Sequence, residues 1–237
     1  MISLFNKPTP KSTKTVFNKN DVFNKNQHFY VCSSGGCGST IILGYLSMFG
    51  NVHHIHDRYP PDKLCYIGGE NTSVPVYNEW FNKTEIPEDK LGSYKVIFLY
   101  RNPIEVIFSR FIGPNIPHLQ HIKCDNNGNI TLNDVIKYGS DLYKLENFFD
   151  NYTIPKKRNY AICCVKYENF FNNINEFNYV LGIPNIKALY PIKHENLKKF
   201  KHLKKLMSIY NSLTIKMNKM KFIEFVIPIN DLEQRVF

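Results

Sequence analysis

The strongest constraint on the fold is a set of short, almost uninterrupted apolar runs that alternate with helical patterns. The clearest run is Tyr94–Tyr100, and similar runs occupy residues 28–32 and 159–165. Such runs are typical of strands that are covered on both faces in a parallel sheet. A last strand is predicted over 221–229. The alternation predicts an α/β fold with right-handed crossovers, a mainly parallel central sheet and flanking helices.

Helical patterns fill the segments between these strands. Asn102 suits the N-cap and Pro103 the first helical position, which predicts a helix over about 103–111. The other predicted helices cover 39–49, 131–150, 169–181 and, as one or two basic helices, 195–221. Residues 51–94 are rich in Pro, His and Gly, and we expect them to form loops with short helices.

The length of 237 residues fits one main domain. Residues 1–26 are polar and basic, and we expect a flexible basic arm there, followed by an α/β domain over 27–237. No apolar run reaches the ~18–20 residues that span a bilayer, and Met1–Lys14 lacks the pattern of a secretory signal. We therefore expect a cytoplasmic protein without a transmembrane segment, whose six cysteines stay reduced.

The chain is basic, with 30 Lys and Arg against 20 Asp and Glu, which gives a formal charge of +10. This excess favours anionic partners such as nucleotides, phosphorylated or sulfated molecules, or nucleic acid. A compositional bias toward Asn, Lys, Ile, Phe and Tyr explains the charge equally well. The net charge is therefore compatible with an anionic partner, but it does not identify a function.

The first candidate site is the loop between the strand at 28–32 and the helix that starts at Ser39. Glycines there allow the backbone to approach an anion closely, and the helix start presents free N–H groups. The candidate anion-binding residues are Gly35, Gly36, Cys37, Gly38, Ser39 and Thr40. The alternative is a simple tight turn. No lysine follows Gly38, so the loop is not a Walker A motif and a conventional ATPase or kinase is disfavoured.

The second candidate site is Arg101, at the carboxyl end of the strand Tyr94–Tyr100. Open α/β sheets bind ligands at this end of their strands, and the planar guanidinium matches a phosphate. Ser109 follows two turns into the next helix and is placed to hold a second oxygen of the same group. The alternative is that Arg101 forms a surface ion pair.

These two segments together resemble the sulfotransferase family, which uses 3′-phosphoadenosine 5′-phosphosulfate as sulfate donor. A third segment is similar to the family's strand that ends in Tyr-Glu; here it covers Ala161–Phe170, and Leu181-Gly182 follows it. The three matches occur in the family's order and cover residues 28 to about 184. The spacing of eight positions from Arg101 to Ser109 is the most specific of them.

The resemblance implies a fold of the P-loop type and a sulfuryl transfer that needs no metal. Arg101 and Ser109 would bind the 3′-phosphate of the donor, and backbone amides from Gly36 to Thr40 would bind the 5′-phosphosulfate. A basic residue would deprotonate a hydroxyl acceptor, for which an anionic glycan is one candidate. Catalysis would then depend on positioning the acceptor against the donor and on neutralising the negative charge of the leaving phosphate.

The loop departs from the family pattern in one respect. Family members usually carry a Lys or Arg at about the position of Gly36, and this loop has no cation. Either the protein binds the donor and turns over poorly, or a cation comes from elsewhere in the chain. The candidates for that cation are Arg58, Lys63, Lys198, Lys199 and Lys201.

The catalytic base is sought just after the first helix, where carbohydrate-type members of the family place a carboxylate or histidine. Residues 53–58 read His-His-Ile-His-Asp-Arg. His56 is our first candidate and Asp57 the second, because both side chains suit acid–base chemistry. Glu70 is a weaker candidate. The alternative is that these are loop residues without a catalytic role.

Two further interpretations compete with an enzyme site. His118, His121 and Cys124 share a spacing that would suit zinc, but no second ligand pair accompanies them. The basic arm and Lys198–Lys205 would suit a nucleic-acid backbone. We favour an amphipathic helix for the second segment, because its apolar residues fall at helical spacing: Leu197, Phe200, Leu203, Leu206 and Met207.

Overall fold

The computed structural model describes residues 26–67, 84–111, 130–185 and 200–229. Within these residues the chain forms one five-stranded sheet of the order β2-β1-β3-β4-β5. The strands are β1 (His28–Cys32), β2 (Asn51–Ile55), β3 (Tyr94–Tyr100), β4 (Ile162–Lys166) and β5 (Ile223–Val226). The first four are parallel, and β5 runs antiparallel to β4. The predicted α/β class with a mainly parallel sheet is confirmed.

The apolar runs predicted the central strands well. β1 and β3 have the predicted bounds, β4 lies within a few residues of its prediction, and β5 is shorter than predicted. Side chains of β3 and β4 are almost all buried, as expected for strands with a neighbour on each side. These strands form the middle of the hydrophobic core.

The prediction of loops and short helices over 51–94 was wrong at its start, where β2 pairs in parallel with β1. β2 is one of the two edge strands of the sheet; Ile55 is buried, Asn51 is exposed and the three residues between them are partly buried. Its sequence carries His53 and His54 in place of a continuous apolar run, so the signal of a buried strand is missing. Further along the segment, the short 3-10 helix η1 (Glu88–Ser93) fits the prediction.

The helices mostly occupy the predicted segments. They are α1 (Ser39–Leu46), α2 (Pro103–Phe111), α3 (Leu132–Tyr138), α4 (Leu145–Thr153), α5 (Tyr167–Phe170), α6 (Ile174–Leu181), α7 (Leu203–Ile209) and α8 (Asn211–Lys219). The single helix predicted over 131–150 is two helices, because Gly139 adopts a φ of 65° and ends α3. The helix predicted over 169–181 is likewise divided, into α5 and α6.

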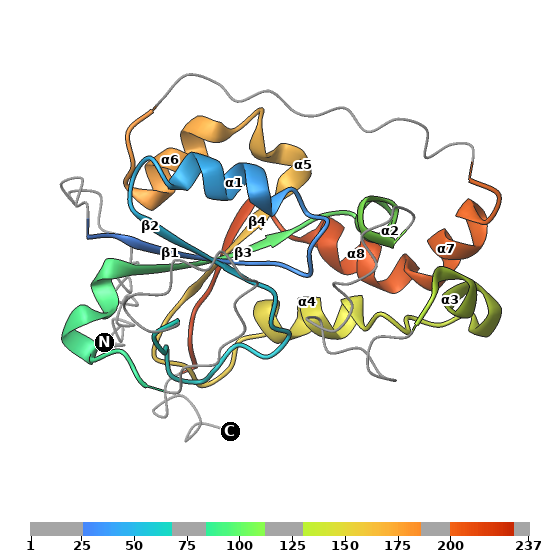
Figure 1. The fold of residues 1–237 in the computed structure, drawn as a ribbon, viewed down its shortest axis with the longest axis horizontal. Coiled ribbons are helices and arrows are strands. Elements are labelled where there is room, and N and C mark those ends of the chain that lie inside the picture. The colour runs from blue at the N-terminus through green and yellow to red at the C-terminus, as the bar shows by residue number, and fades with distance from the viewer. Residues whose placement is uncertain (1–25, 68–83, 112–129, 186–199, 230–237) are drawn as a thin grey trace, which may run out of the picture.

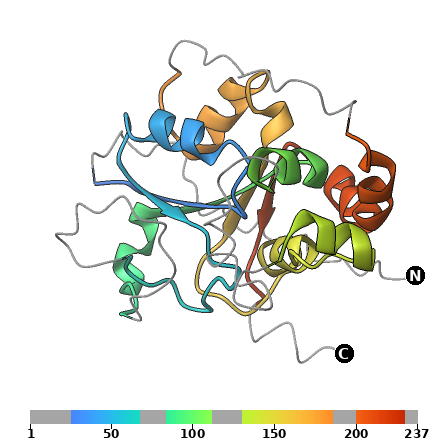
Figure 2. The same ribbon diagram turned by 45° about the vertical axis from the view of Figure 1, so that its right-hand side comes forward.

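Helices cover both faces of the sheet (Figures 1 and 2). In the sheet, β2 lies on one side of β1, and β4 lies on the opposite side of β3. Because such connections between parallel strands are right-handed crossovers, α1, which joins β1 to β2, and α4, which precedes β4, lie on opposite faces of the sheet. α1 packs with α5 and α6 on one face, where the ring of Tyr45 contacts Phe170 and Phe177. The Tyr45 hydroxyl also donates to Asn178 Oδ1 at 2.7 Å.

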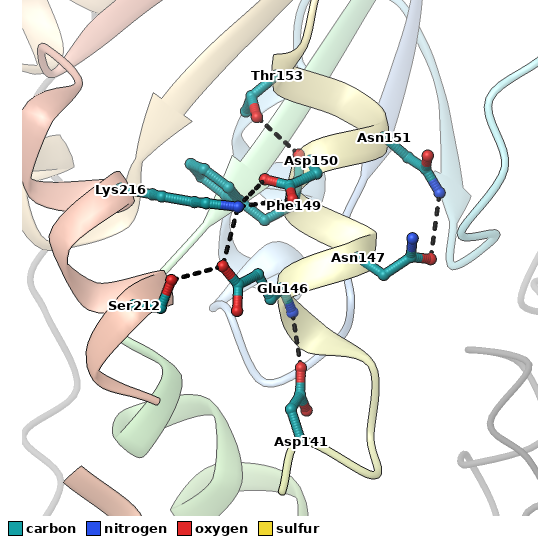
Figure 3. A network of polar contacts seen from close by, with 9 residues as sticks. All are labelled: Asp141, Glu146, Asn147, Phe149, Asp150, Asn151, Thr153, Ser212 and Lys216. Atoms are coloured by element: carbon teal, nitrogen blue, oxygen red, sulfur yellow. Dashed lines mark hydrogen bonds and ion pairs between the residues drawn. The ribbon is translucent and has the colours of Figure 1, made fainter. Parts of the chain in front are cut away.

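α4 covers the opposite face with an aromatic stack. The Phe98 ring lies 4.5 Å from that of Tyr152, centre to centre, and is also stacked with Phe148. Ion pairs and hydrogen bonds connect α8 to α4 (Figure 3). Lys216 Nζ lies 2.9 Å from Glu146 Oε1 and 2.7 Å from Asp150 Oδ2.

In the described part of the chain, no helix is both long enough and apolar enough to cross a membrane. The described cysteines are unpaired and buried: Cys32, Cys37, Cys65, Cys163 and Cys164. They pack as small core residues of the sheet and its loops.

Candidate functional site

The candidate site lies at the carboxyl ends of β1 and β3. These strands are neighbours in the sheet, yet the chain leaves them in opposite directions, to β2 from one and to β4 from the other. In open α/β sheets such a switch in strand order is the place where ligands bind. Cys32 at the end of β1 pairs with Phe98, so β3 extends two residues further and brings its end alongside the loop that follows β1.

The loop after β1, residues 33–38, has the open backbone of an anion-binding loop. Gly35, Gly36 and Gly38 have positive φ angles of 80°, 66° and 75°. Gly38 is the N-cap of α1 and provides no side-chain hydrogen bond to the first turn. An anion accepting from these N–H groups would replace the missing cap. Of the two predicted hydroxyls, Ser39 is buried and Thr40 is exposed.

The glycines are needed because other elements pack against this loop. A Cβ built on Gly38 would lie 2.2 Å from Cε2 of Tyr167, and one on Gly36 would lie 2.9 Å from the Val106 carbonyl oxygen. Both distances are too short for a side chain. The loop is therefore enclosed by α2 and by the start of α5.

Cys37 is the buried centre of the loop. Its thiol lies 3.3 Å from the Gly35 carbonyl oxygen and 3.7 Å from the Ser34 hydroxyl. Burial raises the pKa of the Cys37 thiol to about 11, so the thiol is neutral at physiological pH. Cys37 therefore contributes packing and its backbone N–H to the loop rather than a thiolate.

Arg101 directly follows β3 and is 8% exposed. Its Nη2 donates to Glu105 Oε2 at 2.8 Å, and its Cζ lies 5.1 Å from the centre of the Tyr167 ring. The ion pair is thus partly buried, with the guanidinium inside and the Glu105 side chain 26% exposed. Nε of Arg101 is also buried, and within the described residues it has no hydrogen-bond partner. A buried donor of this kind is costly unless an acceptor is supplied.

The Tyr-Glu segment at the end of β4 joins the two other segments. The Tyr167 ring lies against the Arg101 guanidinium, and it also fills the space that a side chain at position 38 would need. The carboxylate of Glu168 accepts a hydrogen bond from the backbone N–H of Asn102. Asn102 in turn caps α2, since its Oδ1 accepts from the Ile104 N–H at 2.9 Å. The three segments recognised in the sequence therefore meet at the ends of β1, β3 and β4.

Ser109 and Arg110, at the end of α2, have positions that the sequence pattern did not indicate. Ser109 is exposed, whereas Arg110 is buried and donates from Nη1 to the Ser34 carbonyl oxygen at 2.6 Å. Arg110 thus reaches a loop 76 positions earlier in the chain. No local pattern signals such a contact, which is why sequence analysis missed Arg110.

His56 and Asp57 follow β2 and are buried next to the glycine loop. His56 Nδ1 lies 2.7 Å from the Ser33 carbonyl oxygen, which accepts, so Nδ1 carries the proton. In the neutral ring the lone pair is then on Nε2. Asp57 Oδ1 accepts from the Tyr59 N–H at 2.9 Å, and the Asp57 carbonyl accepts from the Tyr152 hydroxyl. The structure brings both predicted residues to the carboxyl edge of the sheet.

A second histidine, His54, contacts His56 and is near enough to Arg110 to be affected by its charge. The rings of His54 and His56 are 4.0 Å apart, centre to centre. Burial and, to a lesser degree, the charge of Arg110 lower the pKa of His54 to about 4. His54 is therefore neutral at physiological pH.

The other residues predicted to supply the cation missing from the glycine loop lie in different parts of the fold. Lys63 is exposed and forms an ion pair of 2.8 Å with Glu85. Arg58 is buried after β2, and its carbonyl accepts from Asn151 Nδ2. Lys201 is exposed ahead of α7, next to Phe200, whose ring contacts Phe108 of α2.

Several predictions lie outside the described residues. They concern the basic arm, the weaker base candidate, two tail cations and the zinc candidates: residues 1–25, Glu70, Lys198, Lys199, His118, His121 and Cys124. Within the described ranges, no group of three or more His, Cys, Asp or Glu side chains is arranged to hold a metal ion.

A narrow pocket opens between the glycine loop and the α4 face of the sheet. Its polar lining comes from Ser34, Cys37 and Arg101, and its apolar lining from α2, α4, α8 and the aromatic residues of β3. It has room for about one water molecule. A larger ligand would therefore bind over the loop and Arg101, at the mouth of this pocket.

Comparison with known proteins gives no relative. No protein-family model matches the chain, and no curated protein or solved structure matches it.

Proposed function

We propose that this protein is a sulfotransferase with a P-loop type of fold, which moves a sulfuryl group from 3′-phosphoadenosine 5′-phosphosulfate to a hydroxyl acceptor. The observation that carries the proposal is the meeting of three separately recognised segments at one edge of the sheet. The glycine loop, Arg101 and the Tyr167-Glu168 pair follow adjacent parallel strands and contact one another.

The donor carries anionic groups at the 3′ and 5′ positions of its ribose, and the site has two features that suit such groups. The loop offers backbone N–H groups and the uncapped start of α1. Arg101 offers a buried guanidinium whose Nε has no acceptor among the described residues. In this proposal the loop holds the 5′-phosphosulfate and Arg101 the 3′-phosphate, and Ser109 is accessible from solvent on α2, the helix that follows Arg101.

His56 is the residue that we assign as the base. In the transfer, the acceptor oxygen forms a bond to sulfur while the bond from sulfur to the 5′-phosphate oxygen breaks, and the electron pair of that bond goes to the phosphate. The acceptor's proton passes to the imidazole of His56, whose Nδ1 donates to the Ser33 carbonyl and so fixes the orientation of the ring. Asp57 is the alternative base.

A thermal-shift titration with 3′-phosphoadenosine 5′-phosphate tests the donor site. At 100-fold excess over Kd, binding to the folded state adds about 2.7 kcal/mol of stability, which raises Tm by about 5–10 °C in a chain of this size. ATP and AMP serve as control nucleotides and should give smaller shifts. Equal shifts with ATP would remove the proposed donor specificity.

The matched pair of variants is Arg101→Gln and Arg158→Gln. Both arginines are buried, but Arg158 lies ahead of β4, where its Nη2 donates to the Asn151 carbonyl at 2.6 Å. Arg101→Gln should abolish the nucleotide shift and Arg158→Gln should retain it. Transfer of labelled sulfate to a panel of phenols, sugars and anionic glycans then separates an enzyme from a nucleotide-binding protein without turnover.

A further inference from the structure

The glycine loop holds no lysine or arginine, but a guanidinium from another element occupies the space above it. A Cβ built on Gly35 would lie 1.2 Å from Nη1 of Arg110 and 2.4 Å from its Cζ. The guanidinium therefore fills the volume that a side chain at position 35 would need. Glycine at this position and arginine at position 110 are structurally complementary.

α2 holds the Arg110 side chain in this position. Arg110 is 6% exposed, and the helix backbone packs against the loop so closely that a Cβ on Gly36 would lie 3.4 Å from the Arg110 Cβ. Nη1 donates to the Ser34 carbonyl at 2.6 Å. A guanidinium has five N–H donors, so this bond is compatible with further bonds to an anion.

Two positive charges lie near enough to the loop centre to act on Cys37. The charges of Arg101 and Arg110 both act to lower the pKa of the Cys37 thiol, against the larger opposite effect of burial. Nε of Arg101 is buried without a hydrogen-bond partner in the described ranges, at the carboxyl end of β3 beside the loop. Nε of Arg158 is in the same state ahead of β4, which makes Arg158 the matched control.

We propose that Arg110 supplies the positive charge for the anionic group held by the glycine loop, in place of a basic residue within the loop. This inference rests on the proposed function, because it assigns Arg110 to the 5′ end of the donor and leaves Arg101 to the 3′-phosphate. Arg110 would thus neutralise the 5′-phosphate as the bond from its oxygen to sulfur breaks.

A four-way binding comparison tests the assignment. Wild type and Arg110→Gln are each titrated calorimetrically with 3′-phosphoadenosine 5′-phosphate and with adenosine 3′-monophosphate, which lacks the 5′ group. Arg110→Gln should weaken binding of the bisphosphate by about 10- to 100-fold and leave binding of the monophosphate unchanged. Equal weakening of both ligands, or no weakening of the bisphosphate, would overturn the proposal.

Two further variants make the comparison robust. Arg158→Gln removes an equally buried arginine that also bonds a carbonyl, and it should leave both affinities at the wild-type value. Arg110→Lys keeps the charge without the planar fork, and it should weaken bisphosphate binding by only a few-fold. If Arg110→Gln does not fold, Arg110→Lys carries the test: a loss confined to the bisphosphate supports the assignment, and no loss overturns it.

Inorganic pyrophosphate separates this proposal from the proposed function. If wild type binds pyrophosphate in a manner that depends on Arg110 but does not bind the nucleotide, the donor assignment fails and the role of Arg110 stands. If wild type binds the nucleotide and Arg110 variants bind it equally well, the donor assignment stands and the role of Arg110 fails. If wild type binds neither probe, both proposals fail.

Discussion

Lys216 and Arg110 both connect elements that are far apart in the sequence, but they do so in opposite ways. Lys216 on α8 is 40% exposed and lies between two carboxylates of α4. Arg110 on α2 is buried, and it donates to a backbone carbonyl in the space above a glycine. An exposed bridge of the first kind costs little to form and contributes little. Removing a buried guanidinium leaves its partner groups unsatisfied, so its loss costs more than that of an exposed bridge. We assign Lys216 to holding the helices together, and we propose for Arg110 the additional role of binding an anion.

The largest effect is expected at the position that makes room for Arg110. Gly35→Ala adds a Cβ at a φ of 80° and in the volume of the guanidinium. It should lower the free energy of unfolding by about 2–4 kcal/mol, because a left-handed alanine is strained and Arg110 loses its position. Denaturant titration measures the change.

Gly44→Ala is the control for this substitution. Gly44 lies inside α1, and nothing is within 4 Å of a Cβ built there. Because alanine favours the helix, this variant should gain about 0.5–1 kcal/mol. If the two variants change stability in the same direction, the glycine of the loop does not serve to accommodate Arg110.

An intermediate effect is expected from pH, through the histidine next to Arg110. The folded-state pKa of His54 is about 4, below its ordinary value of 6.5. As the pH falls from 6.5 to 4, the unfolded chain takes up a proton at this histidine before the folded protein does, so folding stability decreases. His54 contributes at most about 1.4 kcal/mol per pH unit to the slope of the free energy of unfolding against pH.

His54→Gln should flatten this part of the stability curve, measured by denaturant titration between pH 7 and pH 4. An unchanged slope in His54→Gln would mean that the pKa of His54 is not lowered in the folded protein.

The smallest effect is expected at the bridge between α4 and α8. Lys216→Met removes the ion pairs to Glu146 and Asp150 and should cost about 0.5–1 kcal/mol. The loss should shrink in 1 M salt, because exposed charges are screened. Removing Ser212, which donates only to Glu146 Oε1, should cost less. A loss above 2 kcal/mol would make this bridge as important as the buried arginine and would end the distinction drawn between them.

The sequence predicted the parts of the site that depend on local pattern. The strand Tyr94–Tyr100 and the cap at Asn102 have local signatures, so the position of Arg101 at a strand end could be inferred and was found. β2 could not be inferred, because a partly buried edge strand with two histidines has no apolar run. Arg110 could not be inferred either, since its contact with Ser34 depends on how α2 packs on a distant loop.

The antiparallel β5 has a consequence for how the chain is made. β4 pairs with β3 on one side and with Ile223–Val226 on the other. During synthesis the four parallel strands are complete almost sixty residues before β5 emerges, so a nascent chain carries β4 as an unprotected apolar edge. An arrested or truncated polypeptide that ends before residue 223 would keep that edge and would be prone to self-association.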